Sequence, residues 1–237
     1  MRLLFTLILL LLTPAAFAQT KLNLSLKREL DSMYVQDQQY RVLLVGLDPR
    51  KDDSLAAALH LPKGQLFSYI YTNLSRVDSL NLRRVEAIIQ RYGYPGKSLV
   101  GTPANETVWN VIQHSAKIPQ YLPLVKAAAE NSELPYRLYA QMLDRQLKNE
   151  GQEQVYGTQG ASFNVLNTAT GQPEMISFIW PVKDAAHVNE RRRKVGFPTT
   201  VEASAAILGI PYKSVSLAYA MAVKKRSDAY FKQRLHQ

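Results

Sequence analysis

Proline and glycine divide this chain into segments whose apolar residues recur at helical spacing, and this pattern constrains the fold most. A Gly-Tyr-Pro-Gly turn at 93–96 is a strong stop, Pro119 and Pro135 stand near the starts of two further segments, and Gly151 closes the second of them. Because apolar positions spaced three and four residues apart form one face of a helix, the pattern predicts a mainly α protein.

The predicted helices can be placed from these stops and periods. They run over 24–47, from about 66, and over 80–92, 102–114, 119–131, 135–150, 185–195 and 215–235. For the helix over 102–114, Thr102 is expected to be the N-cap, with Pro103 in the first helical position. A polar loop at 47–53 is expected to end the first helix.

After Gly151 the apolar residues recur at every second position instead of every third or fourth, which predicts a single β-hairpin near 162–180. Strands are expected over 162–166 and 175–180, around a turn-rich segment at 167–173, with Ile176, Phe178 and Trp180 on one face. The predicted architecture is therefore a multi-helix single domain over 19–200 with one small hairpin. A C-terminal helical extension over 201–237 follows it.

The first eighteen residues have the organisation of a secretory signal peptide. Arg2 provides a basic start, residues 3–12 are apolar, and an Ala-Phe-Ala cleavage site precedes Gln19. The apolar run is shorter than the ~20 residues of a membrane-spanning helix. An uncleaved anchor and a buried first helix are the alternatives. We expect a mature, secreted or periplasmic protein that begins near Gln19 and has no transmembrane segment.

Composition excludes several classes of site. The chain has no cysteine, which excludes disulfides, thiolate metal sites and cysteine nucleophiles. Its net charge of +10 falls to +9 without Arg2 and attracts anions. The basic clusters at 191–194 and 224–226 lack the interleaved aromatics of nucleic-acid readers, so an anionic envelope component is a better partner than DNA. Histidine spacing typical of zinc is absent, and no metal or cofactor is expected.

Two charges lie inside the apolar stripe of the first predicted helix. Asp37 and Arg41 are four residues apart between Met33 and Leu44, and Gln38 flanks them. A charge turned toward a core is costly unless it is paired, and residues four apart on a helix can pair. The two therefore form either a structural ion pair or a functional pair that lines a pocket.

Further candidates lie near the ends of two later helices. His114, after Gln113, points away from the apolar stripe of its helix and faces solvent or a polar cavity. An isolated histidine is often incidental, but an imidazole suits proton transfer near neutral pH. Asp144 and Arg145 flank the apolar stripe of the helix over 135–150, so both are expected at the surface.

The segment over 152–160 is dense in hydrogen-bonding side chains and glycines. Such a loop is typical of a backbone that approaches a ligand closely, and an ordinary polar turn has the same composition. The nucleophile elbow, the phosphate loop and the dinucleotide fingerprint are all absent from the sequence, so the common nucleophilic and nucleotide-binding templates have no support.

In order along the chain, these motifs resemble the bacterial family catalogued as domain of unknown function 6624. The residues that carry the resemblance, over about 24–200, are Asp37-Gln38-x-x-Arg41, Gly93-Tyr94-Pro95, Val100-Gly101, Trp109, Gln113-His114, Asp144-Arg145, Gln154-x-Tyr156-Gly157-Thr158-Gln159, and Arg192 before Gly196-Phe197. The resemblance implies that these residues belong together and implies no reaction. Ser115-Ala116 departs from the small-then-acidic pair expected after the histidine, so no acidic partner for His114 follows it.

Two functions and a structural role are compatible with this set. In the first, an exported enzyme uses His114 as general acid or base, an aspartate, Asp37 or Asp144, orients it, and polar groups bind an anionic or amide-bearing substrate. The expected binding residues are Gln38, Arg41, Gln113, Arg145, Tyr156, Thr158, Gln159 and Arg192. In the second, the same groups bind a peptide, an envelope fragment or a partner protein without chemistry. In the third, they form a buried polar network that specifies the fold.

Overall fold

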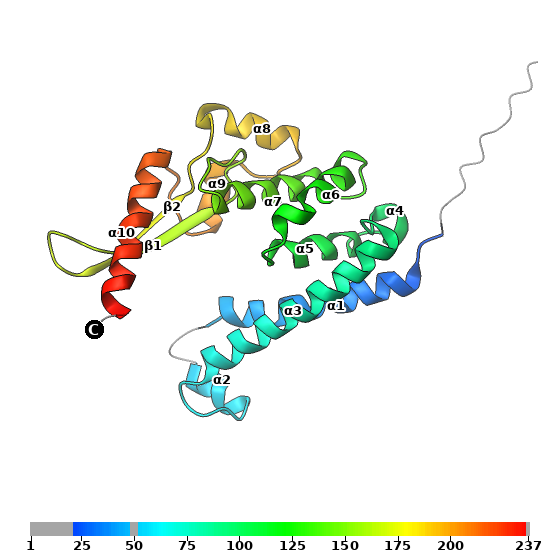
Figure 1. Cartoon of the computed structure of the whole chain (residues 1–237), viewed down its shortest axis with the longest axis horizontal. Coiled ribbons are helices and arrows are strands. Elements are labelled where there is room, and N and C mark those ends of the chain that lie inside the picture. The colour runs from blue at the N-terminus through cyan, green and yellow to red at the C-terminus, as the bar shows by residue number, and fades with distance from the viewer. Residues whose placement is uncertain (1–20, 48–51, 236–237) are drawn as a thin grey trace, which may run out of the picture.

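A computed structural model describes residues 21–47 and 52–235 of the chain (Figure 1). In these residues the α-helices are α1 (Leu24–Val45), α2 (Asp52–Ala58), α3 (Leu66–Tyr92), α4 (Lys97–Val100), α5 (Thr107–Gln113), α6 (Ile118–Glu130), α7 (Tyr136–Asn149), α8 (Val188–Lys194), α9 (Val201–Ile207) and α10 (Leu217–Leu235). The 3₁₀ helices are η1 (Ala104–Glu106) and η2 (Ala185–His187), and the strands are β1 (Gly160–Leu166) and β2 (Pro173–Ile179). The protein is therefore mainly α with one small hairpin, as predicted.

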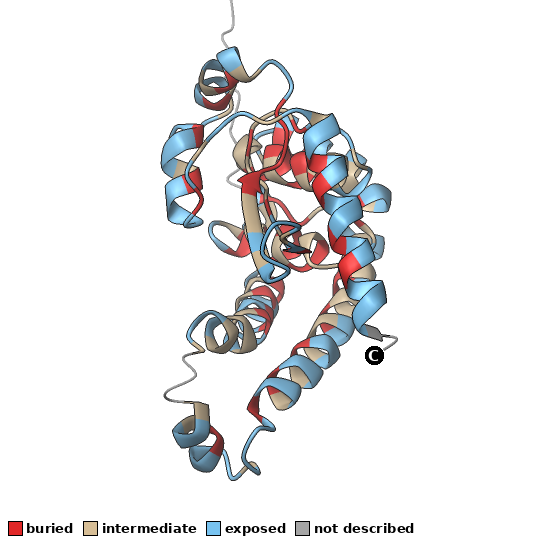
Figure 2. Cartoon of the chain, turned by 90° about the vertical axis from the view of Figure 1, so that its left-hand side faces the viewer, coloured by how far each residue is buried: buried red, intermediate tan, exposed pale blue. Residues whose placement is uncertain are grey.

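Helices α1 and α3 pack side by side and carry α2 at their far end (Figure 1). Leu26, Leu30 and Met33 on α1 are buried in one cluster with Val85 and Ile88 of α3. These positions recur every three or four residues, which keeps them on the facing sides of the two helices. Figure 2 shows how few residues are buried at the α2 end, compared with the body of the protein.

The main core lies where α5, α6 and α7 pack against the first turns of α1 and the last turns of α3. Val108 and Ile112 of α5, Val125 of α6 and Met142 of α7 are fully buried there. The Trp109 indole N–H donates to the Leu138 carbonyl oxygen at 2.7 Å and ties α5 to α7. This core fixes the C-terminal end of α5, where His114 lies, against α1 and α7.

The hairpin forms a smaller core with the C-terminal helix. Its strands are antiparallel and pair Gly160 with Ile179 at one end. Phe178 and Val165 are buried together with Ala220 and Val223 of α10, so the last helix covers one face of the sheet. Trp180, predicted inside the second strand, is buried directly after it.

Several local predictions differ from the structure. The two helices predicted from about 66 and over 80–92 form one continuous α3, because the sequence has no proline or glycine between Leu66 and Tyr92. Gly93 ends it with φ of 70°, a backbone conformation that favours glycine. Helices α2, α4 and α9 were not predicted: each has at most seven residues and, unlike α5 and α8, none is lengthened by a preceding 3₁₀ helix.

Two further predictions are corrected. Thr102 is not a helix N-cap: the chain first makes η1, where the buried Asn105 amide donates to the Glu133 carbonyl oxygen, and α5 begins only at Thr107. Tyr34, predicted on the apolar face of the first helix, is exposed. Of the loop predicted over 47–53, residues 48–51 lie outside the described part, and Asp52 begins α2.

None of the helices in the described residues combines the length and the apolar character that crossing a membrane requires. The predicted leader at 1–18 lies outside the described residues.

Candidate functional site

The row of buried residues on α1 continues from Met33 to Asp37, whose side chain is fully buried. The Gln38 amide donates to Asp37 Oδ2 at 2.7 Å, and Arg41 Nη2 lies 3.3 Å from Asp37 Oδ1. The same Arg41 nitrogen donates to Asp78 Oδ1 on α3 at 2.5 Å. Arg41 therefore bridges two carboxylates on neighbouring helices, which satisfies the buried charge of Asp37.

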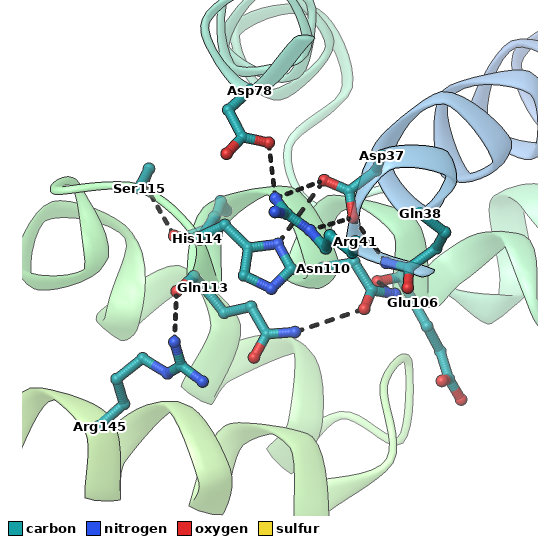
Figure 3. Close-up of polar contacts among 11 residues, drawn as sticks. Asp37, Gln38, Arg41, Asp78, Glu106, Asn110, Gln113, His114, Ser115 and Arg145 are labelled. Carbon is teal, nitrogen blue, oxygen red and sulfur yellow. Dashed lines mark hydrogen bonds and ion pairs between the residues drawn. The ribbon is translucent and has the colours of Figure 1, made fainter. Parts of the chain in front are cut away.

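His114 is the C-cap residue of α5 and faces this ion-pair cluster (Figure 3). Its Nδ1 lies 3.6 Å from Asp37 Oδ1, just beyond hydrogen-bond distance. About a fifth of the imidazole remains exposed, so one side of the ring faces Asp37 and another part is accessible to solvent. The acidic neighbour that the sequence does not supply after the histidine thus comes from α1, 77 positions earlier in the chain.

Burial and charge act in opposite directions on the two carboxyl groups. Burial raises the pKa of Asp37, but His114 and Arg41 together outweigh it and hold that pKa below its usual value. At Asp78, burial and the neighbouring Asp37 outweigh Arg41, so the pKa of Asp78 lies above its usual value. Asp37 is therefore the carboxylate that stays ionised beside the histidine.

A polar cavity of about 530 Å³ opens in front of His114. α1 and α3 contribute Arg41 and Asp78, and the end of α5 contributes Gln113 and His114. The other lining residues are Ser115, Ile118, Arg145, Lys148, Asn149, Gln159 and Gly160. Helices α1, α3, α5 and α7 and the loop before β1 thus meet at one concave surface, which is the arrangement expected of a ligand site.

Two cations of α7 line this cavity without a carboxylate partner among the described residues. Arg145 Nη1 donates to the Gln113 carbonyl oxygen at 3.4 Å, and Lys148 Nζ donates to the Gly160 carbonyl oxygen at 2.6 Å. Burial lowers the pKa of Arg145, and Arg41 lowers it further. Burial lowers the pKa of Lys148, as does its neighbour Arg145. The wall is therefore electropositive and suits an anion.

The Ser115 hydroxyl is already occupied although the residue lines the cavity. Its Oγ donates to the Ile112 carbonyl oxygen at 2.8 Å and accepts from the Lys117 backbone N–H at 3.1 Å. These bonds close the turn after α5. Ser115 is therefore part of the turn that positions His114 and is not an activated nucleophile.

Asp144 belongs to a second, separate polar network. Its fully buried carboxylate accepts from the backbone N–H groups of Val155, Tyr156 and Thr158 at 2.7–3.2 Å, and from the Thr158 hydroxyl at 2.9 Å. The surface position predicted for Asp144 is wrong, because the loop after α7 folds back over it. Burial raises its pKa in spite of these donors.

Arg192 holds the opposite side of the same loop. Its side chain donates to the Tyr156 carbonyl oxygen at 2.8 Å, to the Thr199 carbonyl oxygen at 2.9 Å and to Ser204 Oγ at 2.5 Å. Its guanidinium lies 4.5 Å from the centre of the Phe197 ring. These contacts use the guanidinium to hold the loop in place, and with Thr158 the residue lines a different cavity of about 490 Å³.

Gln159 connects the loop to the His114 cavity. Its Nε2 donates to Thr158 Oγ1 at 3.0 Å, and its backbone N–H donates to Oε1 of the buried Gln154 at 2.9 Å. Gly157 has φ of 67°, and a Cβ there would lie 2.6 Å from Val201, so the loop needs glycine at that position. The Asp144 network therefore presents Gln159 to the cavity.

The structure thus divides the eleven residues of the predicted site. Asp37, Gln38, Arg41, Gln113, His114, Arg145 and Gln159 lie at or directly behind the cavity. Asp144, Tyr156, Thr158 and Arg192 lie in the loop network beside it.

Six residues that line the cavity were not in the predicted site: Asp78, Ser115, Ile118, Lys148, Asn149 and Gly160. Asp78 had a readable signal, because it falls in the buried row of α3 with Leu74, Asn81 and Val85, as Asp37 does on α1. For Lys148 and Asn149 the sequence gives no such signal, since polar residues at the end of an amphipathic helix are usually solvated. Among the described residues, no group of three His, Asp or Glu could hold a metal ion.

A family model described as Family of unknown function (DUF6624) matches residues 61–212. No curated protein and no solved structure matches the chain. The family match includes Asp78, His114 and the loop through Gln159. It begins after α1, so Asp37, Gln38 and Arg41 lie before the matched residues, although the sequence motifs placed them in the same set.

Proposed function

The chain belongs to DUF6624, a family of unknown function, and we propose that it is an exported enzyme in which His114 transfers protons on an anionic substrate. One observation carries the proposal: the imidazole of His114 has an ionised, buried carboxylate behind it and an electropositive cavity in front of it. Histidine, carboxylate and cation here come from three different helices, α5, α1 and α7.

The carboxylate gives the two ring nitrogens of His114 different roles. Asp37 Oδ1 lies beside Nδ1, which favours the tautomer that carries its proton on Nδ1 and leaves the lone pair on Nε2. A shift of a few tenths of an ångström would close a hydrogen bond, and such contacts often shorten when substrate binds. Nε2 then acts as general base, and Asp37 stabilises the imidazolium that forms.

The substrate is bound by the other wall of the cavity. Arg145 and Lys148 offer cationic donors, and Gln113, Asn149 and Gln159 offer amides. A group that carries negative charge, in the ground state or as it develops in the reaction, is stabilised at this wall. Because the Ser115 hydroxyl closes a turn, the proposed chemistry is direct acid–base catalysis without a covalent serine intermediate.

A non-catalytic binding module is the second candidate, for a peptide, an envelope fragment or a partner protein. The three amide side chains in the cavity favour it, because an amide donates and accepts hydrogen bonds without exchanging a proton with its ligand. In that case the Asp37–Arg41–Asp78 cluster serves to hold α1 against α3, and His114 is one more contact.

The substitution His114→Ala separates these functions. With a panel of carboxylate- and phosphate-bearing esters and amides, we expect the wild type to convert at least one compound and the variant to be ~10²–10⁴-fold slower, the usual contribution of a general acid or base. Thermal unfolding should change little, since His114 Nδ1 makes no hydrogen bond to the described residues.

Ser132→Ala is the matched control, at an exposed residue outside the cavity, and should leave turnover unchanged. Equal turnover by the wild type and His114→Ala would contradict the enzyme. Binding of a panel compound without turnover would favour the module. A fall in the unfolding temperature of more than ~4 °C, about what 1 kcal/mol produces in a domain near this size, would indicate a structural histidine.

Export is the part of the proposal that rests on the sequence alone. The basic start, apolar run and Ala-Phe-Ala site predict cleavage after Ala18. Mass spectrometry of protein purified from the culture medium or the cell envelope should find Gln19, or its cyclised form, at the N-terminus. Mature protein that retains Met1 would contradict both the cleavage and its assignment as a signal peptide.

A further inference from the structure

A second hollow, of about 460 Å³, adjoins the cavity in front of His114. Both are lined by Lys148 and Asn149 at the end of α7. The two hollows are also neighbours at the start of β1, where Gly160 lines the first hollow and the next residue, Ala161, lines the second. The two hollows therefore have a common border at Lys148 and Asn149.

The two hollows differ in chemistry. The second is lined by Ala161 and Phe163 of β1, by Trp180 after β2 and by Met221 of α10. The Trp180 indole N–H donates to the Gln152 carbonyl oxygen at 2.7 Å, so this residue offers the hollow only its apolar ring. The walls are thus largely apolar, in contrast to the amides and charges of the first cavity.

The charged residues at the second hollow already have partners. Lys224 Nζ lies 2.8 Å from Asp228, and Glu150 accepts from Gln146 and Gln152. Lys148 differs from them, because its one hydrogen bond to the described residues goes to a neutral carbonyl oxygen. The ammonium group of Lys148 therefore lies where the two hollows meet, next to Arg145, and the apolar walls of the second hollow lie on its other side.

We infer that the substrate of this site is an amphiphile. Its anionic group binds Arg145 and Lys148 beside His114, and an alkyl or aryl extension occupies the hollow lined by Phe163, Trp180 and Met221. The inference rests on the proposed function for the position of the anion and adds the apolar part of the substrate. Water leaves the apolar walls when the extension binds, which drives its burial.

Titration calorimetry with the mature protein and straight-chain carboxylates tests the inference. From acetate through butanoate and hexanoate to octanoate, affinity should rise about fourfold for each added methylene that is buried. Phenylacetate and phenylbutanoate form a second series, which distinguishes an aryl-bearing from an alkyl-bearing substrate. We expect affinity to rise with length in both series. The series in which it rises more steeply shows whether the apolar part of the substrate is alkyl or aryl.

Substitutions locate the two parts of the ligand. Met221→Asp puts a carboxylate on the apolar wall and should weaken octanoate at least tenfold while leaving acetate unchanged. Met175→Asp is the matched control on β2, outside the hollow, and should change neither. Phe163→Ser is a second test of the same wall. Lys148→Met should weaken acetate and octanoate alike.

The possible failures are distinct. Acetate and octanoate of equal affinity, or octanoate unaffected by Met221→Asp and Phe163→Ser, would overturn the apolar subsite and leave the anion site intact. No binding by any carboxylate would overturn the inference together with the proposed anionic substrate. Thermal unfolding of each variant shows whether it is folded before its affinity is compared.

Discussion

Asp144→Ala is expected to destabilise the protein by about 3 kcal/mol or more, because three backbone N–H groups lose their charged acceptor at about 1–3 kcal/mol each. The substitution removes the acceptor of the Val155, Tyr156 and Thr158 backbone N–H groups and leaves these partly buried groups unpaired. In thermal unfolding this corresponds to a fall of roughly 10 °C or more. The loop that carries Gln159 should also become accessible to proteases.

Asp144→Asn and Asp228→Ala are the controls for this result. The asparagine retains one acceptor oxygen in the same place and should cost less than alanine. Asp228 is exposed and pairs with Lys224 on the surface, so its loss should change stability by less than ~0.5 kcal/mol. Stability of Asp144→Ala close to that of Asp228→Ala would mean that the carboxylate does not hold the loop.

Arg41→Met is expected to have the second-largest effect, and one that depends on pH. The guanidinium lies between Asp37 and Asp78, and without it two carboxylates face each other in a partly buried place. At pH 7 we expect a loss of about 3–5 kcal/mol, because both acids are then ionised and no longer paired.

The sign of the pH dependence follows from the pKa values of Asp37 and Asp78. In the wild type this pKa is lowered on folding, so the stability that Asp37 contributes is present above its unfolded pKa and is lost as pH falls through the folded value. Without Arg41, the pKa of Asp78, which burial already raises, rises further, and Asp37 loses one of the two groups that lower its pKa. The variant then loses stability as pH rises through the raised pKa of Asp78, and its deficit against the wild type shrinks toward acid.

Unfolding temperatures of the wild type and Arg41→Met between pH 4 and pH 8 measure this difference. Arg84→Met is the matched control, since Arg84 pairs with Glu29 across the same two helices at the surface. It should cost little at either end of the range. A deficit for Arg41→Met that stays constant with pH would show that the ion-pair cluster does not carry the effect.

Much of the fold could be predicted because its signals are local. Proline, glycine and the apolar period place the long helices and the hairpin within a few residues. The short helices α2, α4 and α9 were missed, whereas α5 and α8, also of seven residues, were found because η1 and η2 lengthen their helical segments. Thr102 was misplaced because the chain makes the 3₁₀ helix η1 before α5 begins at Thr107, and the Asn105 side chain of η1 bonds the Glu133 carbonyl oxygen 28 positions later.

The site was predictable in part for the same reason. A charge within an apolar row is a local signal, and it identified Asp37 and Arg41 on α1. Asp144 lies at the edge of the apolar stripe of α7, which predicts an exposed side chain. It is buried because the loop after α7 folds back over it. The placement of Lys148 depends on how α7 meets the start of β1, which no single segment of the sequence encodes.

The boundary of the family match divides the site of this chain in two. The match begins at residue 61 and holds the histidine and the cationic wall, whereas the carboxylate behind the histidine belongs to α1, before the match. The matched part of this chain therefore excludes the carboxylate that we propose sets the tautomer of His114. A chain with the same cavity but no acidic residue at this point of its first helix would have the imidazole without a carboxylate behind it.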